Sequence, residues 1–176
     1  MKYFLSTALF CSLIYFLYSG SGTSEINQGP KPIEKSISIT PPKSHEVIDI
    51  FEGVPIYANG HIRNNYGRHL TTDGYNLGLK WQCVEFVKRY YYEKLGHKMP
   101  DSYGHARDFF DKNIGTGWNE ARGLYQFENG NFEKPETRSI VGFDGNASNE
   151  FGHVAIISAV NKTEIEVVQY NKIGAQ

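Results

Sequence analysis

The chain has 176 residues, which fits one domain of ordinary size with tails. Apolar residues make up 40% of the sequence and aromatic residues 14%, so the main body is not a chain disordered by composition. The formal net charge of −1 provides no broad basic field, which argues against nucleic acid and an anionic membrane surface as partners.

The N-terminus has the pattern of an export signal. Lys2 is followed by an apolar stretch from Tyr3 to Tyr18 and then by small residues at 19–22. The stretch is shorter than the roughly 20 residues of a spanning helix, yet long enough to resemble an uncleaved anchor. Residues 1–22 are therefore predicted to be a signal peptide or a membrane anchor. We expect an exported protein, in the periplasm, at the cell surface or secreted, that contacts a membrane only through this segment.

Residues 23–50 have the composition of an extended linker. Four prolines lie among serine, threonine and lysine residues, without a sustained period of 2 or 3.6 residues. The folded domain is then expected to cover residues 51–176. Its first part, residues 59–78, is rich in glycine and asparagine and is predicted to be mostly loop.

Two helices are predicted next along the chain. The first runs from about Gln82 to Leu95, and Gly96 supplies its stop. Its apolar stripe at helical spacing consists of Val84, Phe86, Val87, Tyr90, Tyr91 and Leu95. A second, shorter helix is predicted from Ser102, as N-cap, to Asn113. The residues expected to face inward from it are Ala106, Phe109 and Phe110.

The C-terminal third of the chain predicts strands. Alternating or continuous apolar residues indicate strands at 139–143, 152–160 and 163–170, and the last two are expected to form a hairpin. Helices followed by an antiparallel sheet make an α+β order rather than an alternating α/β order.

The apolar pattern of the hairpin predicts its register. A three-residue loop, Asn161–Thr163, pairs Val160 with Glu164 and His153 with Asn171. A two-residue loop would turn the apolar residues of the second strand to the other face. The residues expected to share one face are His153, Ala155, Ile157, Ala159, Ile165 and Val167.

Cys83 is the cysteine that could act as a nucleophile. Cys11 lies in the apolar N-terminal run, so Cys83 has no expected partner, although cysteines of exported proteins are normally paired. A buried cysteine that acts as a small hydrophobic residue is the alternative. A position at the start of a helix favours the nucleophile, because the unpaired N–H groups of the first turn stabilise a thiolate and a nearby oxyanion.

His153 is the best candidate for the base that this nucleophile needs. It follows Gly152 and begins a strongly apolar strand, and a polar ring at the start of such a strand can point from the sheet edge toward a cleft. The other five histidines lie in the linker, in loops or in the second predicted helix: His45, His61, His69, His97 and His105. Gln169, a diagonal neighbour of His153, and Asn171, directly opposite, are candidates to orient the imidazole.

Two motifs carry a resemblance. They are Lys80-Trp81-Gln82-Cys83-Val84-Glu85-Phe86 and Gly152-His153-Val154-Ala155-Ile156-Ile157. Together they resemble the CHAP family, the cysteine- and histidine-dependent amidohydrolases and peptidases. The first motif is most similar to the amidase domain of the bifunctional glutathionylspermidine synthetases/amidases. The resemblance covers about residues 54–171 and implies a papain-like α+β fold, in which the helix with the cysteine packs on an antiparallel sheet with the histidine.

The resemblance also implies roles for single residues. It implies amide hydrolysis through an acyl-enzyme, with Cys83 as nucleophile, His153 as base and Gln82 as a contributor to the oxyanion hole. Where the family usually has a Glu-x-Asn pattern, this chain reads Gln169-Tyr170-Asn171. Relatives continue with further strand structure, so a domain truncated at Gln176 is one interpretation.

These observations predict a cysteine amidohydrolase or peptidase. The export pattern favours a peptidoglycan amidase or endopeptidase that cuts cell-wall peptide. The Cys83 motif favours an alternative, an amidase on a small amide such as glutathionylspermidine, and a catalytically weak wall-binding module is the third interpretation. The sequence lacks the usual metal-ligand spacings, and no cofactor, metal or nucleic acid is expected.

Overall fold

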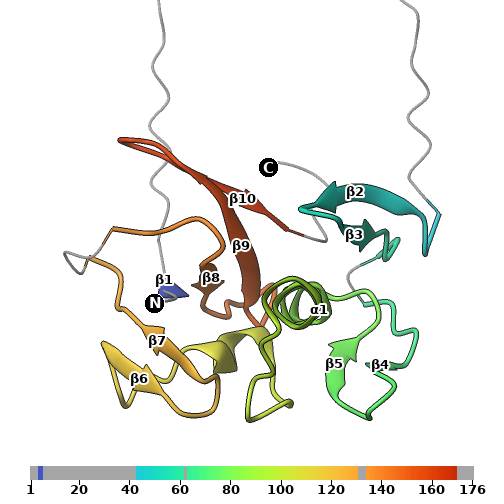
Figure 1. Ribbon diagram of the computed structural model, residues 1–176, viewed down its shortest axis with the longest axis horizontal. Coiled ribbons are helices and arrows are strands. Elements are labelled where there is room, and N and C mark those ends of the chain that lie inside the picture. Colours follow the sequence, from blue (N-terminus) through green and yellow to red (C-terminus); the bar gives the residue numbers. More distant parts are fainter. Residues whose placement is uncertain (1–3, 6–42, 62, 131–133, 170–176) are drawn as a thin grey trace, which may run out of the picture. The chain divides into compact units, whose positions relative to one another are not determined.

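The computed structural model describes residues 4–5, 43–61, 63–130 and 134–169 (Figure 1). The elements in chain order are β1 (Phe4–Leu5), β2 (Val47–Phe51), β3 (Val54–Tyr57), β4 (Arg68–Leu70), β5 (Asn76–Leu79), α1 (Cys83–Leu95), η1 (Ala106–Phe109), β6 (Gly117–Asn119), β7 (Leu124–Gln126), β8 (Ile140–Phe143), β9 (His153–Val160) and β10 (Ile165–Val168). Apart from β1, the predicted signal or anchor segment lies outside the described residues. Within those residues, no helix is long and apolar enough to cross a membrane.

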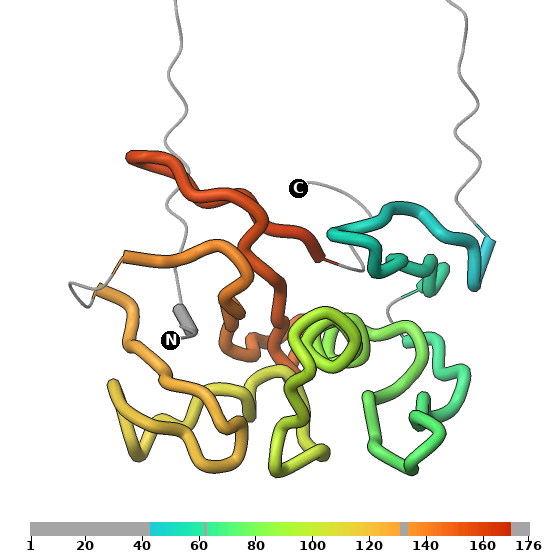
Figure 2. Tube along the Cα trace, viewed as in Figure 1, coloured from blue at the N-terminus to red at the C-terminus, as the bar shows by residue number. Residues whose placement is uncertain are grey.

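The core is built by α1 and a four-stranded sheet. The sheet has the order β1-β8-β9-β10, in which β8, β9 and β10 are antiparallel and β1 pairs with β8 in parallel. Helix α1 packs against β9 and also against β5 and β3, and Figure 2 traces these elements from teal (β3) to orange-red (β9). The α+β prediction, with a helix packed on antiparallel strands, is therefore confirmed.

Helix α1 follows its predicted bounds closely. Its inner face is fully buried, with Val87, Tyr90 and Tyr91 each at 0% exposure. Gly96 adopts the left-handed conformation at φ 61°, and its backbone N–H donates to the carbonyl oxygen of Tyr91. The helix begins at Cys83, after an extended residue, Gln82.

The second predicted helix, Ser102–Asn113, is wrong in length and type. The structure has one short 3₁₀ turn, η1, at Ala106–Phe109. The backbone N–H of His105 donates to Oδ2 of Asp108 at 2.7 Å, so the turn begins at His105 rather than Ser102. Phe110 is extended and ends the turn. The inward positions are retained, because Ala106 and Phe109 are both buried.

The loop of the C-terminal hairpin differs from the three-residue prediction. Val160 pairs with Ile165 rather than with Glu164. The backbone N–H of Asn161 donates to the carbonyl oxygen of Glu164 at 2.8 Å, which closes the turn one residue later than predicted.

A β-bulge restores the predicted register farther along the hairpin. The register shifts between Glu166 and Val167, and Val167 then pairs with Ile157 as the three-residue loop would require. The predicted apolar face is confirmed for Ala155, Ile157, Ile165 and Val167, which pack in one cluster. The predicted partner of His153, Asn171, lies outside the described residues.

The folded unit extends into the predicted linker. Strand β2 begins at Val47 and pairs with β3, although the composition indicated a linker as far as residue 50. Backbone hydrogen bonds hold β2, and most of its side chains are exposed. Apolar side chains of β2 are exposed on both faces of the strand and do not alternate with polar ones, so the sequence carries no periodic signal that would have predicted this strand.

Candidate active site

Cys83 occupies the first position of α1. Gln82 precedes it in an extended conformation, φ −89° and ψ 163°, and acts as N-cap without a side-chain cap. The thiol is free and partly buried, and it packs against the core cluster that includes Phe86 and Val154. The first-turn geometry predicted for Cys83 is therefore present.

Burial changes the expected charge of this thiol. Desolvation raises the pKa of Cys83, and hydrogen bonds from the backbone N–H groups of Val154, Val84 and Cys83 itself oppose that rise without overcoming it. The sequence-based expectation of a thiolate favoured by the helix terminus is therefore wrong for this geometry. The partial charge of the helix is weaker than the cost of burying the anion.

The contact with Val154 also brings Cys83 to the start of β9. Val154 directly follows His153, so the sulfur lies at the peptide next to the candidate base. No hydrogen bond between Cys83 and the His153 ring is present among the described contacts. Catalytic hydrogen bonds often tighten only in the reacting complex, so this geometry is compatible with a cysteine–histidine pair.

Gly152 sets the position of His153. Its φ of 72° is left-handed, and a Cβ there would lie 2.6 Å from the carbonyl oxygen of Phe143 and 3.0 Å from the backbone nitrogen of Arg107. A larger residue would therefore force apart β8, η1 and the start of β9. This close approach explains physically why glycine precedes the histidine in the second motif.

Gln169 holds the imidazole of His153. Oε1 of Gln169 lies 2.9 Å from Nε2 of His153. An amide oxygen only accepts, so Nε2 carries the hydrogen and Nδ1 of the neutral ring keeps the lone pair. Burial lowers the pKa of His153, and the bond to Gln169 opposes this change only in part. A neutral imidazole with a basic Nδ1 is the result.

The remaining predicted residues are placed as follows. The side chain of Gln82 donates from Nε2 to the carbonyl oxygen of Asn64 at 2.8 Å, which ties the residue before the nucleophile to a distant loop. Asn171 lies outside the described residues, so its predicted role stays a prediction. The structure thus brings together Gln82, Cys83, His153 and Gln169.

A buried ion-pair network lies on α1 close to Cys83. Glu85 and Arg89 are 1% and 2% exposed, and Nε of Arg89 lies 2.7 Å from Oε1 of Glu85. Nδ1 of His69, from β4, lies 2.7 Å from the same oxygen. The sequence analysis did not single out this network, although the i, i+4 spacing of Glu85 and Arg89 was its visible signal.

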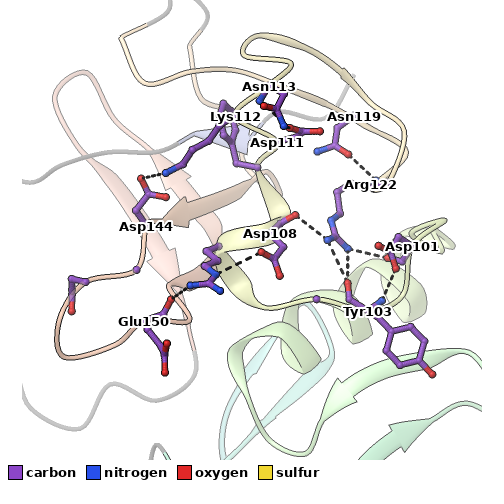
Figure 3. A pocket seen from close by; sticks show the side chains of 16 residues that line it. Asp101, Tyr103, Asp108, Asp111, Lys112, Asn113, Asn119, Arg122, Asp144 and Glu150 are labelled. Carbon is purple, nitrogen blue, oxygen red and sulfur yellow. Dashed lines mark hydrogen bonds and ion pairs between the residues drawn. The ribbon is translucent and has the colours of Figure 1, made fainter.

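A separate hollow of about 780 Å³ lies between η1, the turn after β6 and the loop that follows β8 (Figure 3). Arg122, which is 3% exposed, donates to the carbonyl oxygens of Asp101 and Asp108, each at 2.9 Å. Neither Cys83 nor His153 lines this hollow. No group of three or more metal-ligating side chains that could hold an ion is found among the described residues.

The sequence matches the CHAP domain family over residues 73–171, more than half of the chain. The chain belongs to the CHAP family. The match contains Cys83, His153, Gln169 and Asn171, and it confirms the resemblance inferred from the two motifs. CHAP domains are cysteine amidohydrolases and peptidases, so the family places this chain among them.

Relatives of this CHAP domain are larger proteins. The chain is 29% identical over 119 residues to trypanothione synthetase of Crithidia fasciculata, covering 67% of this chain and 18% of the relative. It is 28% identical over 106 residues to bifunctional glutathionylspermidine synthetase/amidase of Escherichia coli (strain K12), covering 55% and 16%. Glutathionylspermidine synthase of Crithidia fasciculata is 23% identical over 171 residues, covering 86% and 22%. The chain thus spans about a fifth of the length of these curated relatives.

Proposed function

We propose that this protein hydrolyses amide bonds through an acyl-enzyme, with Cys83 as nucleophile and His153 as base. The observation that carries the proposal is the meeting of two chain segments. The sulfur of Cys83, at the first position of α1, accepts a hydrogen bond from the backbone N–H of Val154, the residue after His153. Gln169 holds the His153 imidazole through Nε2. Membership of the CHAP family supports the same roles, and a papain-like fold is the arrangement that the family implies.

The proposed acylation starts from a neutral pair. Sγ of Cys83 attacks the amide carbonyl carbon while its proton passes to Nδ1 of His153. The carbonyl oxygen becomes an oxyanion, and the backbone N–H of Cys83 and the side-chain amide of Gln82 donate to it. The imidazolium then protonates the leaving nitrogen, the C–N bond breaks, and an acyl-thioester remains on Cys83.

Deacylation uses the same groups in reverse. His153 removes a proton from water, the hydroxide attacks the thioester carbonyl, and Sγ leaves with the proton returned to it. Gln169 keeps Nε2 protonated throughout, so that Nδ1 is the nitrogen that exchanges protons. The amide of Gln169 supplies orientation without a negative charge.

For the substrate, we propose cell-wall peptide. The argument is the export pattern of residues 1–22, since a peptidoglycan amidase or endopeptidase must reach the wall. A second candidate is a small amide such as glutathionylspermidine. Its support is the similarity to a relative named glutathionylspermidine synthetase/amidase.

Product analysis of two incubations tests the proposal. The purified full chain is incubated with peptidoglycan and, separately, with glutathionylspermidine, with Cys83→Ala as the matched control, followed by mass spectrometry. New amine ends in the wall peptide indicate the first substrate, and release of glutathione and spermidine indicates the second. Hydrolysis of neither would contradict the enzymatic proposal and favour a wall-binding module.

A further inference from the structure

A loop far from the motifs holds the residue before the nucleophile. Nε2 of Gln82 donates to the carbonyl oxygen of Asn64 at 2.8 Å, and the backbone N–H of Gln82 donates to Leu79 at 2.9 Å. The bond to Asn64 fixes the plane of the Gln82 amide. Because both hydrogens of an amide nitrogen lie in that plane, the direction in which Gln82 donates depends on where the Asn64 carbonyl lies.

Hydrogen bonds within the loop from Asn59 to Asn64 hold the Asn64 carbonyl in place. Nδ2 of Asn64 donates to the backbone oxygen of Asn59 at 2.5 Å, and the backbone N–H of Asn64 donates to the oxygen of His61 at 2.9 Å. Nδ2 of Asn59 donates to the same His61 oxygen at 2.8 Å and lies 3.5 Å from the Asn64 oxygen. Tyr66 adds a hydroxyl that donates to Asn59 and accepts from Asn64.

The burial of Asn59 indicates which end of its side chain is used. The residue is 0% exposed, and its Oδ1 has no hydrogen-bond partner. An unpartnered buried acceptor costs free energy, so Oδ1 does not account for a polar side chain at this position. The donor Nδ2 accounts for it, because it bonds the His61 carbonyl oxygen and so holds the loop that carries the Asn64 carbonyl.

We propose that Asn59 is a positioning residue for the oxyanion site, acting through Asn64 on Gln82. The inference rests on the proposed function, in which Gln82 donates to the oxyanion. Misplacing a donor by a fraction of an ångström weakens its interaction with developing charge, whereas the reactivity of the thiol itself does not depend on that donor. Loss of Asn59 therefore affects oxyanion binding and leaves Cys83 alkylation unchanged.

A reversible aldehyde measures oxyanion binding without any turnover. The sulfur of Cys83 adds to the carbonyl carbon of acetyl-glycinal, a C–S bond forms, and the carbonyl oxygen takes the proton released from the thiol to give a hemithioacetal. The dissociation constant is obtained from the protection of Cys83 against iodoacetamide. In Asn59→Asp, an acceptor replaces the donor at nearly the same volume, and we expect binding about tenfold weaker. The alkylation rate without aldehyde should stay within about twofold of wild type.

A double-mutant cycle separates positioning from a general structural role. In a Gln82→Ala background, Asn59→Asp should cause no further weakening of aldehyde binding, because the donor that it positions is gone. Asn119→Asp is the matched control, since Asn119 is also buried and its Nδ2 donates to a backbone carbonyl, that of Phe109 at the end of η1. It should leave aldehyde binding unchanged. If Asn59→Asp does not fold, the milder Tyr66→Phe takes its place and should give a smaller loss that also disappears in Gln82→Ala.

Three results would overturn the inference: equal weakening with and without Gln82, equal weakening in Asn119→Asp, or a parallel loss of alkylation. Failure of the proposed function looks different. If wild-type Cys83 forms no hemithioacetal at all, Cys83 is not the nucleophile, and the roles of Gln82 and Asn59 fall with it.

Discussion

Oε1 of Gln169 lies 2.9 Å from Nε2 of His153, which defines the ring nitrogen that carries the hydrogen. Burial lowers the pKa of this histidine and raises that of Cys83. The pair therefore rests as a thiol and a neutral imidazole, and not as the thiolate–imidazolium pair that a helix N-terminus alone would favour.

The ionisation of Cys83 is the first point to test. Because burial raises its pKa, the pH midpoint for iodoacetamide alkylation should lie above the ordinary value of about 8.5. Stopped alkylation followed by mass spectrometry of the labelled peptide gives the midpoint. Cys83→Ala should abolish both labelling and turnover. Rapid labelling at pH 6 would show instead that an ion pair is preformed.

Gln169→Glu should change the pH dependence in a defined direction. A carboxylate next to Nε2 stabilises the imidazolium, so the pKa of His153 rises. The base must be neutral to accept the thiol proton, and activity is lost as the pH falls through that pKa. The acid limb of the pH–rate profile should thus move to higher pH, in parallel with the His153 ring-proton shift in NMR titrations. An unchanged limb would mean that His153 is not the base.

Gln169→Ala should lower kcat/KM by about 10- to 100-fold, because the ring loses the partner that orients it. The sequence also offers Asn171, predicted to lie directly opposite His153, as a candidate for the same role. Steady-state kinetics of Gln169→Ala and Asn171→Ala compares the two. A larger loss in Asn171→Ala would return the orienting role to the asparagine.

The buried Glu85–Arg89 pair predicts an effect on stability. Arg89→Met leaves the carboxylate of Glu85 buried without this partner and should destabilise the fold by roughly 3–5 kcal/mol in urea unfolding. Lys98→Met is the control, since Lys98 pairs with Asp73 at the surface, where both side chains are about half exposed. Solvent screens this pair, so its loss should change the free energy of unfolding far less than Arg89→Met does. If both substitutions destabilised the fold equally, burial of the Glu85–Arg89 pair would not make its loss more costly than that of a surface pair.

The export prediction has a direct chemical readout. If the apolar stretch from Tyr3 to Tyr18 is cleaved, the mature chain should begin near Ser21 to Thr23. N-terminal sequencing of exported protein measures this. An intact Met1 in a membrane fraction would indicate an anchor, and full-length protein in the cytosol would remove the main argument for a cell-wall substrate.

Local patterns determined the parts of the site that depend on neighbours along the chain. The stripe from Val84 to Leu95 and the stop at Gly96 fix a helix that begins at Cys83. The apolar run after Gly152 fixes a strand that begins at His153. Periodicity and end signals are properties of short segments, so the sequence carried these two elements, their α+β order and the family motifs within them.

Tertiary structure decided everything that joins segments distant in sequence. Gln82 takes its hydrogen-bond partner from Asn64, 18 residues earlier, and a bulge at Ser158 in β9 rather than the loop length sets the final register of the hairpin. The protonation of Cys83 follows from burial by the packed core, which outweighs the local helix field that the sequence revealed. Desolvation depends on all the atoms around a group, and the residues next to Cys83 in the sequence do not reveal which distant residues will bury it.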